Sequence, residues 1–175
     1  IERNIFNRFL MMNIFEEIVS KNKKDYIQDL EEIIISSKNG TNSVQEHFLD
    51  KVTQLKCKKD DFNYNPNSLE LIEEFASKTG QEGINERSIV ATHKGQSDWN
   101  SLILFSHPDT EKFVSNEGWK NDPFEPKIIR NKIHGWGIAD DLAGVSMMYH
   151  ALDVIKKTGI NLKGDLILAS TPSKN

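Results

Sequence analysis

Residues 101–106 read SLILFS, a short apolar run with polar residues on both sides. A run of this length and composition predicts a buried β-strand. Residues 165–170 read DLILAS and predict a second buried strand of the same kind. Between them, apolar residues recur every three or four positions over residues 141–158, which predicts a helix that ends before Gly159. Strand, long excursion, helix and strand are typical of an α/β fold with a mainly parallel sheet.

On either side of these elements, the sequence predicts further helices and strands and one long loop. Helices are expected over residues 4–19, 24–36, 43–56 and 68–79, and strands over residues 88–92 and 127–133. Ser43 and Glu46 have the spacing of a capping box for the third of these helices. The segment 107–127 contains three prolines and a glycine and is expected to be a loop, and 57–66 a polar connection.

Composition bounds the class of protein. The 175 residues are 37% apolar and 27% charged, with a mean hydropathy of −0.53, which fits a soluble globular chain of about one domain. The formal net charge of −4 lacks the basic footprint of a general nucleic-acid binder. Residues 1–19 carry five charges, so they predict an amphipathic helix and neither a membrane span nor a signal peptide. Cys57 is the one cysteine, which excludes an internal disulfide and suits a cytoplasmic protein.

A histidine and an aspartate follow the SLILFS strand, as His107-Pro108-Asp109. Ligands of open α/β sheets bind at the carboxyl ends of the strands. Residues two apart in an extended chain point to the same side, so His107 and Asp109 can project together. A carboxylate that accepts the Nδ1 proton of a histidine leaves Nε2 for a metal ion. Taken alone, the pair also fits an ordinary loop histidine beside an acid.

A second motif, GWGIADD, occupies residues 135–141 at the head of the predicted helix. Its two glycines allow a tight loop, and Asp140 falls where the helix dipole favours a carboxylate. Carboxylate oxygen and imidazole nitrogen are both good zinc ligands. Asp140 and Asp141 together oppose a bound phosphate, which excludes a nucleotide site. Taken alone, either aspartate also fits a plain helix cap.

The two motifs in this order resemble the family of cocatalytic zinc deacylases and exopeptidases. That family includes acetylornithine deacetylase, succinyl-diaminopimelate desuccinylase, aminoacylase and glutamate carboxypeptidase. Its H-x-D motif, which follows a hydrophobic strand, is matched by His107 and Asp109. Its G-x-G-x-x-D motif, at a helix start, is matched by Gly135, Gly137 and Asp140.

Other segments extend the resemblance. A tryptophan followed by D-P-F-x-P is matched by Trp119 and residues 122–126. Residues 43–48, SVQEHF, look like the family's N-terminal helix with its glutamate. The resemblance covers roughly residues 24–175 and is strongest over residues 101–170.

The resemblance implies a three-layer α/β sandwich with a mixed, mostly parallel sheet, the phosphorylase/hydrolase-like zinc peptidase fold, present here in incomplete form. Residues 1–40 would be an N-terminal helical segment. Residues 41–175 would be the first part of a metallopeptidase-like catalytic domain, without its C-terminal half and dimerisation domain. The start at Ile1 and the end shortly after a strand lead us to expect a fragment that is inactive alone.

The resemblance also implies a site and a reaction. His107 would bind one metal ion, Asp109 would be catalytic and hold the imidazole, and Asp140 would bridge two divalent ions, expected to be zinc. The peptide bond between Asp140 and Asp141 would be cis. Metal-activated water would hydrolyse a peptide or N-acyl amide bond of a small N-acyl amino acid or peptide. We expect neither nucleic acid nor membrane as a partner, and a homodimer of the full-length protein.

One departure from the family pattern leaves an alternative open. The family's next motif is a glutamate pair just beyond the following strand, but Lys174 and Asn175 occupy those positions here. A protonated lysine does not bind zinc, and an amide is a poor zinc ligand. The alternative is a non-catalytic relative that keeps the fold as a binding or assembly module.

Four further residues carry open interpretations. His47 and His150 fall on helix faces that we expect to be solvated. Trp119 and Trp136 flank the predicted site, where either can line a substrate pocket or serve only in packing.

Overall fold

The computed structural model describes residues 2–65 and 85–172. The helices are α1 (Glu2–Ser37), α2 (Thr41–Gln54) and α3 (Ala143–Lys157). The strands are β1 (Lys58–Tyr64), β2 (Glu86–His93), β3 (Trp99–Ser106), β4 (Lys127–Ile129), β5 (Lys132–His134) and β6 (Gly164–Ser170). The helix expected over residues 68–79 lies outside the described residues, as do Lys174 and Asn175.

Four strands form one mixed sheet in the order β1-β2-β6-β3. The α/β class and the mixed sheet predicted from the sequence are confirmed. β3 and β6, the two apolar runs, pair in parallel with Ser106 opposite Ser170, while β2 is antiparallel to both β1 and β6. Among the described strands of this sheet only the β3–β6 pair is parallel, in contrast to the mostly parallel sheet that was expected, because β2 runs antiparallel to both of its neighbours.

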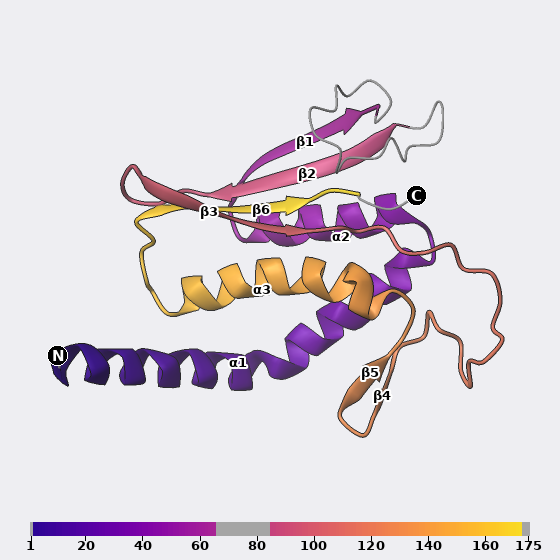
Figure 1. Ribbon diagram of the computed structural model, residues 1–175, viewed down its shortest axis with the longest axis horizontal. Helices are drawn as coiled ribbons and strands as arrows, with labels where there is room; N and C mark the ends of the chain where they lie inside the picture. Colours follow the sequence, from indigo (N-terminus) through magenta and orange to yellow (C-terminus); the bar gives the residue numbers. More distant parts are fainter. Residues whose placement is uncertain (1, 66–84, 173–175) are drawn as a thin grey trace, which may run out of the picture.

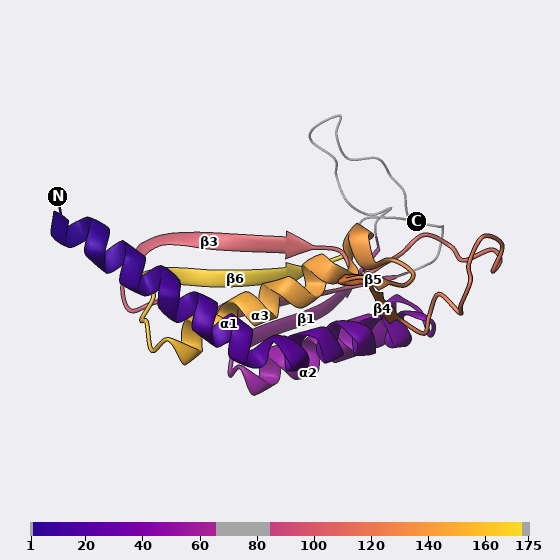
Figure 2. The same ribbon diagram turned by 90° about the horizontal axis from the view of Figure 1, so that it is seen from below.

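The three helices lie on one face of this sheet (Figures 1 and 2). Every second side chain of a strand points toward the helices. Ile89 and Leu168 are two of these side chains, and both are fully buried. The helices contribute Ile33, Ile34, Val44, Phe48, Val52, Val145, Tyr149 and Leu152 to the same core. The expectation that residues 101–106 form a buried strand is wrong for the described residues, because β3 lies at an edge of the sheet and most of its side chains are exposed. On the face away from the helices, Ile103 and Phe105 are each about 60% exposed. The described residues thus form two layers of the expected sandwich.

α1 is one continuous helix, where the sequence suggested two. Residues 1–37 contain neither glycine nor proline, and the lysines at 21, 23 and 24 are good helix formers, so nothing breaks the helix there. The capping box expected at Ser43 and Glu46 does not form. Gly40 is the N-cap of α2 without a side-chain hydrogen bond, and Glu46 pairs with Arg87 instead.

Two strand assignments also differ from the expectation. Residues 57–66, expected to be a polar connection, contain the edge strand β1. Its side chains are largely charged and exposed, so they lack the alternation of apolar and polar residues that predicts a strand. The single strand expected over 127–133 is a hairpin of β4 and β5. Arg130 and Asn131 both have positive φ, at 50° and 61°, which is the geometry of a tight hairpin turn.

α1 has 36 residues, yet within residues 2–65 and 85–172 no helix is both long and apolar enough to cross a membrane.

Candidate metal centre

The fold brings the three sequence-predicted site residues together at the carboxyl end of β3. His107 Nε2 lies 3.0 Å from Asp140 Oδ1, although 33 positions separate the two residues. His107 Nδ1 faces Asp109, at 3.1 Å from its main-chain oxygen and 3.4 Å from its Oδ1. The Asp109 side chain is 7% exposed and that of Asp140 is 58% exposed. The imidazole is therefore held at Nδ1 by the buried Asp109, and its Nε2 faces the exposed carboxylate of Asp140.

The hydrogen-bonding roles of the two imidazole nitrogens explain why this geometry suits a bound cation. When Nδ1–H donates to Asp109, the neutral ring leaves a lone pair on Nε2. That lone pair and the Asp140 carboxylate then point at each other across 3.0 Å. Two acceptors facing each other are satisfied by a proton on Nε2 or by a cation bound to both. The donor set, imidazole nitrogen plus carboxylate oxygen, is one that zinc binds in proteins.

Asp140 and Asp141 are held by a turn, Ile138–Leu142, that leads into α3. Their peptide bond is cis, as the resemblance implied. The Asp141 carboxylate accepts a hydrogen bond of 2.6 Å from Ser106 Oγ at the end of β3. Neither aspartate caps α3, so the alternative of a plain helix cap is not what the structure shows: the N-cap is Leu142, without a side-chain hydrogen bond. The role of Ser106 was missed, because the contact depends on two distant segments meeting.

Two glycines near the turn are required by close packing. Gly137 has φ of 67°, and a Cβ there would lie 2.3 Å from the Thr110 methyl carbon. A Cβ on Gly144 would lie 2.4 Å from Asp141 Oδ1. At Gly137 the positive φ and the nearby Thr110 side chain both favour glycine, and at Gly144 the absence of a Cβ leaves room for the Asp141 carboxylate.

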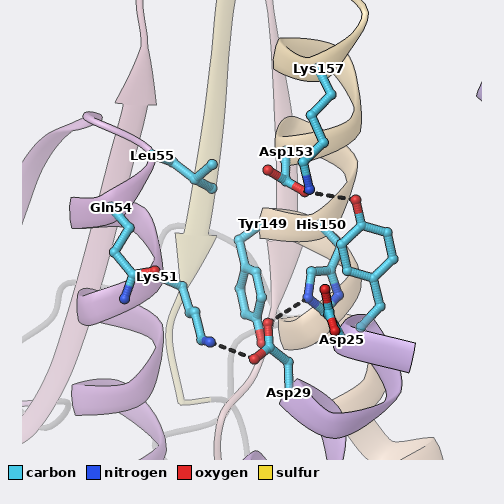
Figure 3. Close-up of a pocket in the computed structure, with 10 residues that line it drawn as sticks. Asp25, Asp29, Lys51, Gln54, Leu55, Tyr149, His150, Asp153 and Lys157 are labelled. Carbon is cyan, nitrogen blue, oxygen red and sulfur yellow. Dashed lines mark hydrogen bonds and ion pairs between the residues drawn. The ribbon is translucent and has the colours of Figure 1, made fainter. Parts of the chain in front are cut away.

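A second polar cluster joins the three helices and overturns the expectation that His47 and His150 are solvated. His150 Nε2 lies 2.9 Å from Asp29 Oδ2, and Lys51 Nζ lies 2.5 Å from Asp29 Oδ1 (Figure 3). His47 Nε2 is buried and has no hydrogen-bond partner among the described residues. The long helix α1 covers the faces of α2 and α3 that carry these histidines, which the helical periodicity of each segment alone did not reveal.

Burial and hydrogen bonds together shift the pKa values of this cluster. Burial lowers the pKa of His150, although the hydrogen bond with Asp29 favours the charged form. Burial, with the Lys51 ammonium as the second cause, lowers the pKa of His47. Burial alone would raise the pKa of Asp29, but hydrogen bonds from Lys51 and His150 outweigh it and hold that pKa below its ordinary value. Asp29 therefore serves as the anionic centre of the cluster.

Within the part of the chain that the structure describes, Asp29, Glu32 and His47 are the one set of three potential metal ligands that converge, with ligand atoms within 4.8 Å of one another. Both oxygens of Asp29 are already engaged by Lys51 and His150. The Lys51 ammonium would repel a cation at this point. We therefore interpret the cluster as an ion-pair network between helices and not as the metal centre.

Replacing Lys51 with methionine tests that interpretation. Lys51→Met removes the ammonium from a pair in which both side chains are 20% exposed, so we expect the free energy of unfolding to fall by about 2 kcal/mol. The matched control is Lys38→Met, at an ion pair with Asp122 where the lysine side chain is 59% exposed, with an expected cost below about 0.5 kcal/mol. Urea denaturation measures both. Equal losses in the two variants would contradict a structural role for the buried pair.

Part of the chain matches a known protein family in sequence. Residues 103–173 match peptidase family M20/M25/M40. N-formyl-4-amino-5-aminomethyl-2-methylpyrimidine deformylase of Bacillus subtilis is 35% identical over 85 residues, 47% of this chain and 20% of the relative. The deformylase of Halalkalibacterium halodurans is 35% identical over 88 residues, with 49% and 21% covered. The chain thus spans about a fifth of the length of the curated relatives it matches.

Solved structures extend the likeness to nearly the whole chain. Human carnosine dipeptidase 1 has a TM-score of 0.72 at 14% identity, covering 90% of this chain and 33% of the dipeptidase. The dipeptidase Dug1p of Saccharomyces cerevisiae has a TM-score of 0.71 at 14% identity, covering 92% and 34%. The predicted resemblance is therefore confirmed: residues 103–173 match peptidase family M20/M25/M40, and the chain shares the fold of these dipeptidases over about a third of their length.

Proposed function

We propose that the protein is a metal-dependent hydrolase that cleaves a peptide or N-acyl amide bond of a small substrate. The observation that carries the proposal is the facing pair of His107 Nε2 and Asp140 Oδ1, 3.0 Å apart, with Asp109 against the other ring nitrogen. The family match supports it. The names of the relatives suggest the first substrates to test, which are N-formyl amines and dipeptides.

Each residue at this site has a separate proposed role. His107 and Asp140 would hold a divalent metal, zinc by the chemistry of the donors, with Asp140 bridging to a second ion. When bound, the metal acidifies a water molecule and polarises the amide carbonyl, so that water and amide give a carboxylate and an amine. Asp109 holds the His107 ring with Nε2 toward the site. Ser106 fixes Asp141 and thereby positions its neighbour Asp140.

The proposal extends to the rest of the protein. A catalytic zinc ordinarily has three protein ligands, and the described residues bring two to this point. We propose that the further ligands lie outside the described residues and that residues 41–175 are the first part of the catalytic domain, preceded by a helical segment at residues 1–40. A cytoplasmic location and a homodimer belong to the same proposal.

Metal removal and reloading test the proposed function. The full-length protein is treated with a chelator, dialysed, and assayed on N-formyl amines, N-acetyl amino acids and dipeptides before and after zinc is added. We expect hydrolysis to disappear on chelation and to return with zinc. Turnover that survives complete metal removal would contradict the proposal.

A protein that binds zinc but hydrolyses none of these amides would also contradict it. That result would favour the alternative, a non-catalytic relative that binds or assembles. The lysine and asparagine at positions 174 and 175 are the sequence observation that favours this alternative.

A further inference from the structure

The first half of α1 runs past the end of α3 (Figures 1 and 2). Asn22 still contacts the body of the protein, because Lys157 in the last turn of α3 donates a hydrogen bond of 2.9 Å to its Oδ1. Nearer the N-terminus, Met12 is 60% exposed and Val19 is 45% exposed. Most of the stability of a helix in a protein comes from the packing of one apolar face. The exposed apolar side chains of this segment therefore mark a face that has room for a partner.

Six residues share this open face of α1. Because an α-helix has 3.6 residues per turn, positions three, four, seven or eight apart lie on one side of it. The residues at this spacing are Met12, Glu16, Val19, Ser20, Lys23 and Ile27. Ile34, seven positions after Ile27, is fully buried beside the glycine turn, where a Cβ on Gly135 would lie 3.2 Å from its Cγ2. The rest of the protein thus covers this side of α1 at Ile34 and leaves it open toward Met12.

A groove of about 590 Å³ lies where the open face meets the β4–β5 hairpin. Ile27 and Ile128 form its apolar part, and Ile128 is 51% exposed. The charged residues that line it are Lys21, Lys23, Lys24 and Glu31. None of the three lysines forms an ion pair with another described residue. An apolar groove with a basic rim is complementary to a helix that carries apolar side chains and carboxylates.

The open face itself carries such a set, because its charges are opposite on the two sides of Val19. Glu16 precedes Val19 and Lys23 follows it, and neither forms an ion pair with another described residue. When two copies of the helix lie antiparallel, Glu16 of each copy faces Lys23 of the other, whereas a parallel pair places like charges together. The midpoint of the two positions falls between Val19 and Ser20. Ser20 is small enough to let the two helices approach closely there.

We propose that the open face of α1 is an interface with a second copy of this chain, in which two α1 helices pack antiparallel about a two-fold axis between Val19 and Ser20. Met12 of one copy then lies against Ile27 of the other, in the groove beside Ile128. The flexible methionine side chain suits an irregular apolar groove. This inference rests on the proposed function for the homodimer alone and is independent of the reaction.

Cysteine cross-linking tests the antiparallel register in the full-length protein. In Ser20→Cys, at an exposed position, the two thiols lie beside the axis, so oxidation with copper phenanthroline should join most chains as dimers on a non-reducing gel. The matched control is Met12→Cys on the same face. Its two thiols are about 22 Å apart along an antiparallel pair, so few dimers are expected. The wild type, whose Cys57 is 7% exposed, gives the background.

The outcome of cross-linking decides between the two orientations of the helices. Dimers formed by Ser20→Cys and not by Met12→Cys support the proposal. Dimers formed equally by both variants, by Met12→Cys alone, or by neither would overturn it.

Charge reversal tests the ion pairs of the interface. Glu16→Lys turns both pairs into repulsion and should raise the dimer Kd about tenfold, measured by analytical ultracentrifugation of the full-length protein at low salt. Glu16→Lys combined with Lys23→Glu restores both pairs with exchanged signs, so its Kd should return to within about threefold of the wild type. The matched control is Glu17→Lys, which has the same charge change about 100° around the helix and should alter the Kd less than about threefold. Equal effects of Glu16→Lys and Glu17→Lys, or no recovery in the double variant, would overturn the proposal.

The two experiments separate the interface from the rest of the proposed function. A dimer that neither cross-links through Ser20→Cys nor weakens in Glu16→Lys would overturn this interface and leave the homodimer to another surface. Cross-linking through Ser20→Cys in a protein that hydrolyses none of the tested amides would support the interface and count against the proposed reaction alone.

Discussion

His107→Ala is expected to lower kcat/KM for any amide that the protein hydrolyses by at least about a thousandfold. The substitution removes the imidazole whose Nε2 lies 3.0 Å from Asp140 Oδ1. The proposed metal ion would then lose one of its two ligands among the described residues. Loss of a direct metal ligand should also lower the zinc content, measured by elemental analysis of the dialysed protein.

The control for this experiment is His93→Ala. His93 pairs with Leu166 at the start of β6, the opposite end of the sheet from the metal centre. We expect its zinc content and kcat/KM to stay within about twofold of the wild type, on the ordinary scale of substitutions outside a site. If His107→Ala kept both the zinc and the activity, the assignment of His107 as a ligand would be wrong.

Gly137→Ala is expected to lower the free energy of unfolding by about 3 kcal/mol. About 1 kcal/mol comes from the left-handed backbone, with φ of 67°, and the rest from a Cβ placed 2.3 Å from the Thr110 methyl carbon. The clash separates the glycine turn from the loop that carries Asp109, so hydrolysis should fall with stability. Urea denaturation and kcat/KM measure the two effects.

Two variants isolate the packing contribution of Gly137. Gly159 has φ of 72°, and a Cβ added there would meet no atom within 4 Å, so Gly159→Ala carries the backbone cost alone, about 1 kcal/mol. Thr110→Ser removes the clashing methyl and should recover at least about 1 kcal/mol in the Gly137→Ala background. Equal costs at the two glycines would show that the close approach to Thr110 contributes nothing.

The strands and the helix that surround the site were predictable because their signals are local. β3, β6 and α3 occur where the apolar runs and the helical periodicity over residues 101–106, 165–170 and 141–158 predicted a strand, a strand and a helix. The burial expected for β3 was wrong, because the apolar run alone does not show that the strand lies at an edge of the described sheet. β1 was not predictable, because an exposed edge strand has no buried face to impose alternation. α1 is continuous because residues 2–37 contain no glycine or proline. This absence can be read from the sequence, but the apolar periodicity used to predict helices does not take it into account.

The residues of the proposed metal centre were selected in a different way. His107, Asp109 and Asp140 follow from strand ends and a helix start together with the family resemblance, and the structure brings all three within hydrogen-bonding or ion-pair distance. The contact of Ser106 with Asp141 was not predictable, because nothing local marks a serine that meets a segment 35 residues away. The pairing of His150 with Asp29 spans 121 residues and has no sequence motif at all.

The central claim is that His107 and Asp140, and not the Asp29 cluster, hold the metal. Anomalous diffraction at the zinc absorption edge, from crystals of the full-length protein grown with zinc, tests it most directly. We predict a peak bonded to His107 Nε2 and to a carboxylate oxygen of Asp140, at about 2.0–2.2 Å from each. A peak confined to Asp29, Glu32 and His47, or zinc bound only away from His107, would contradict it.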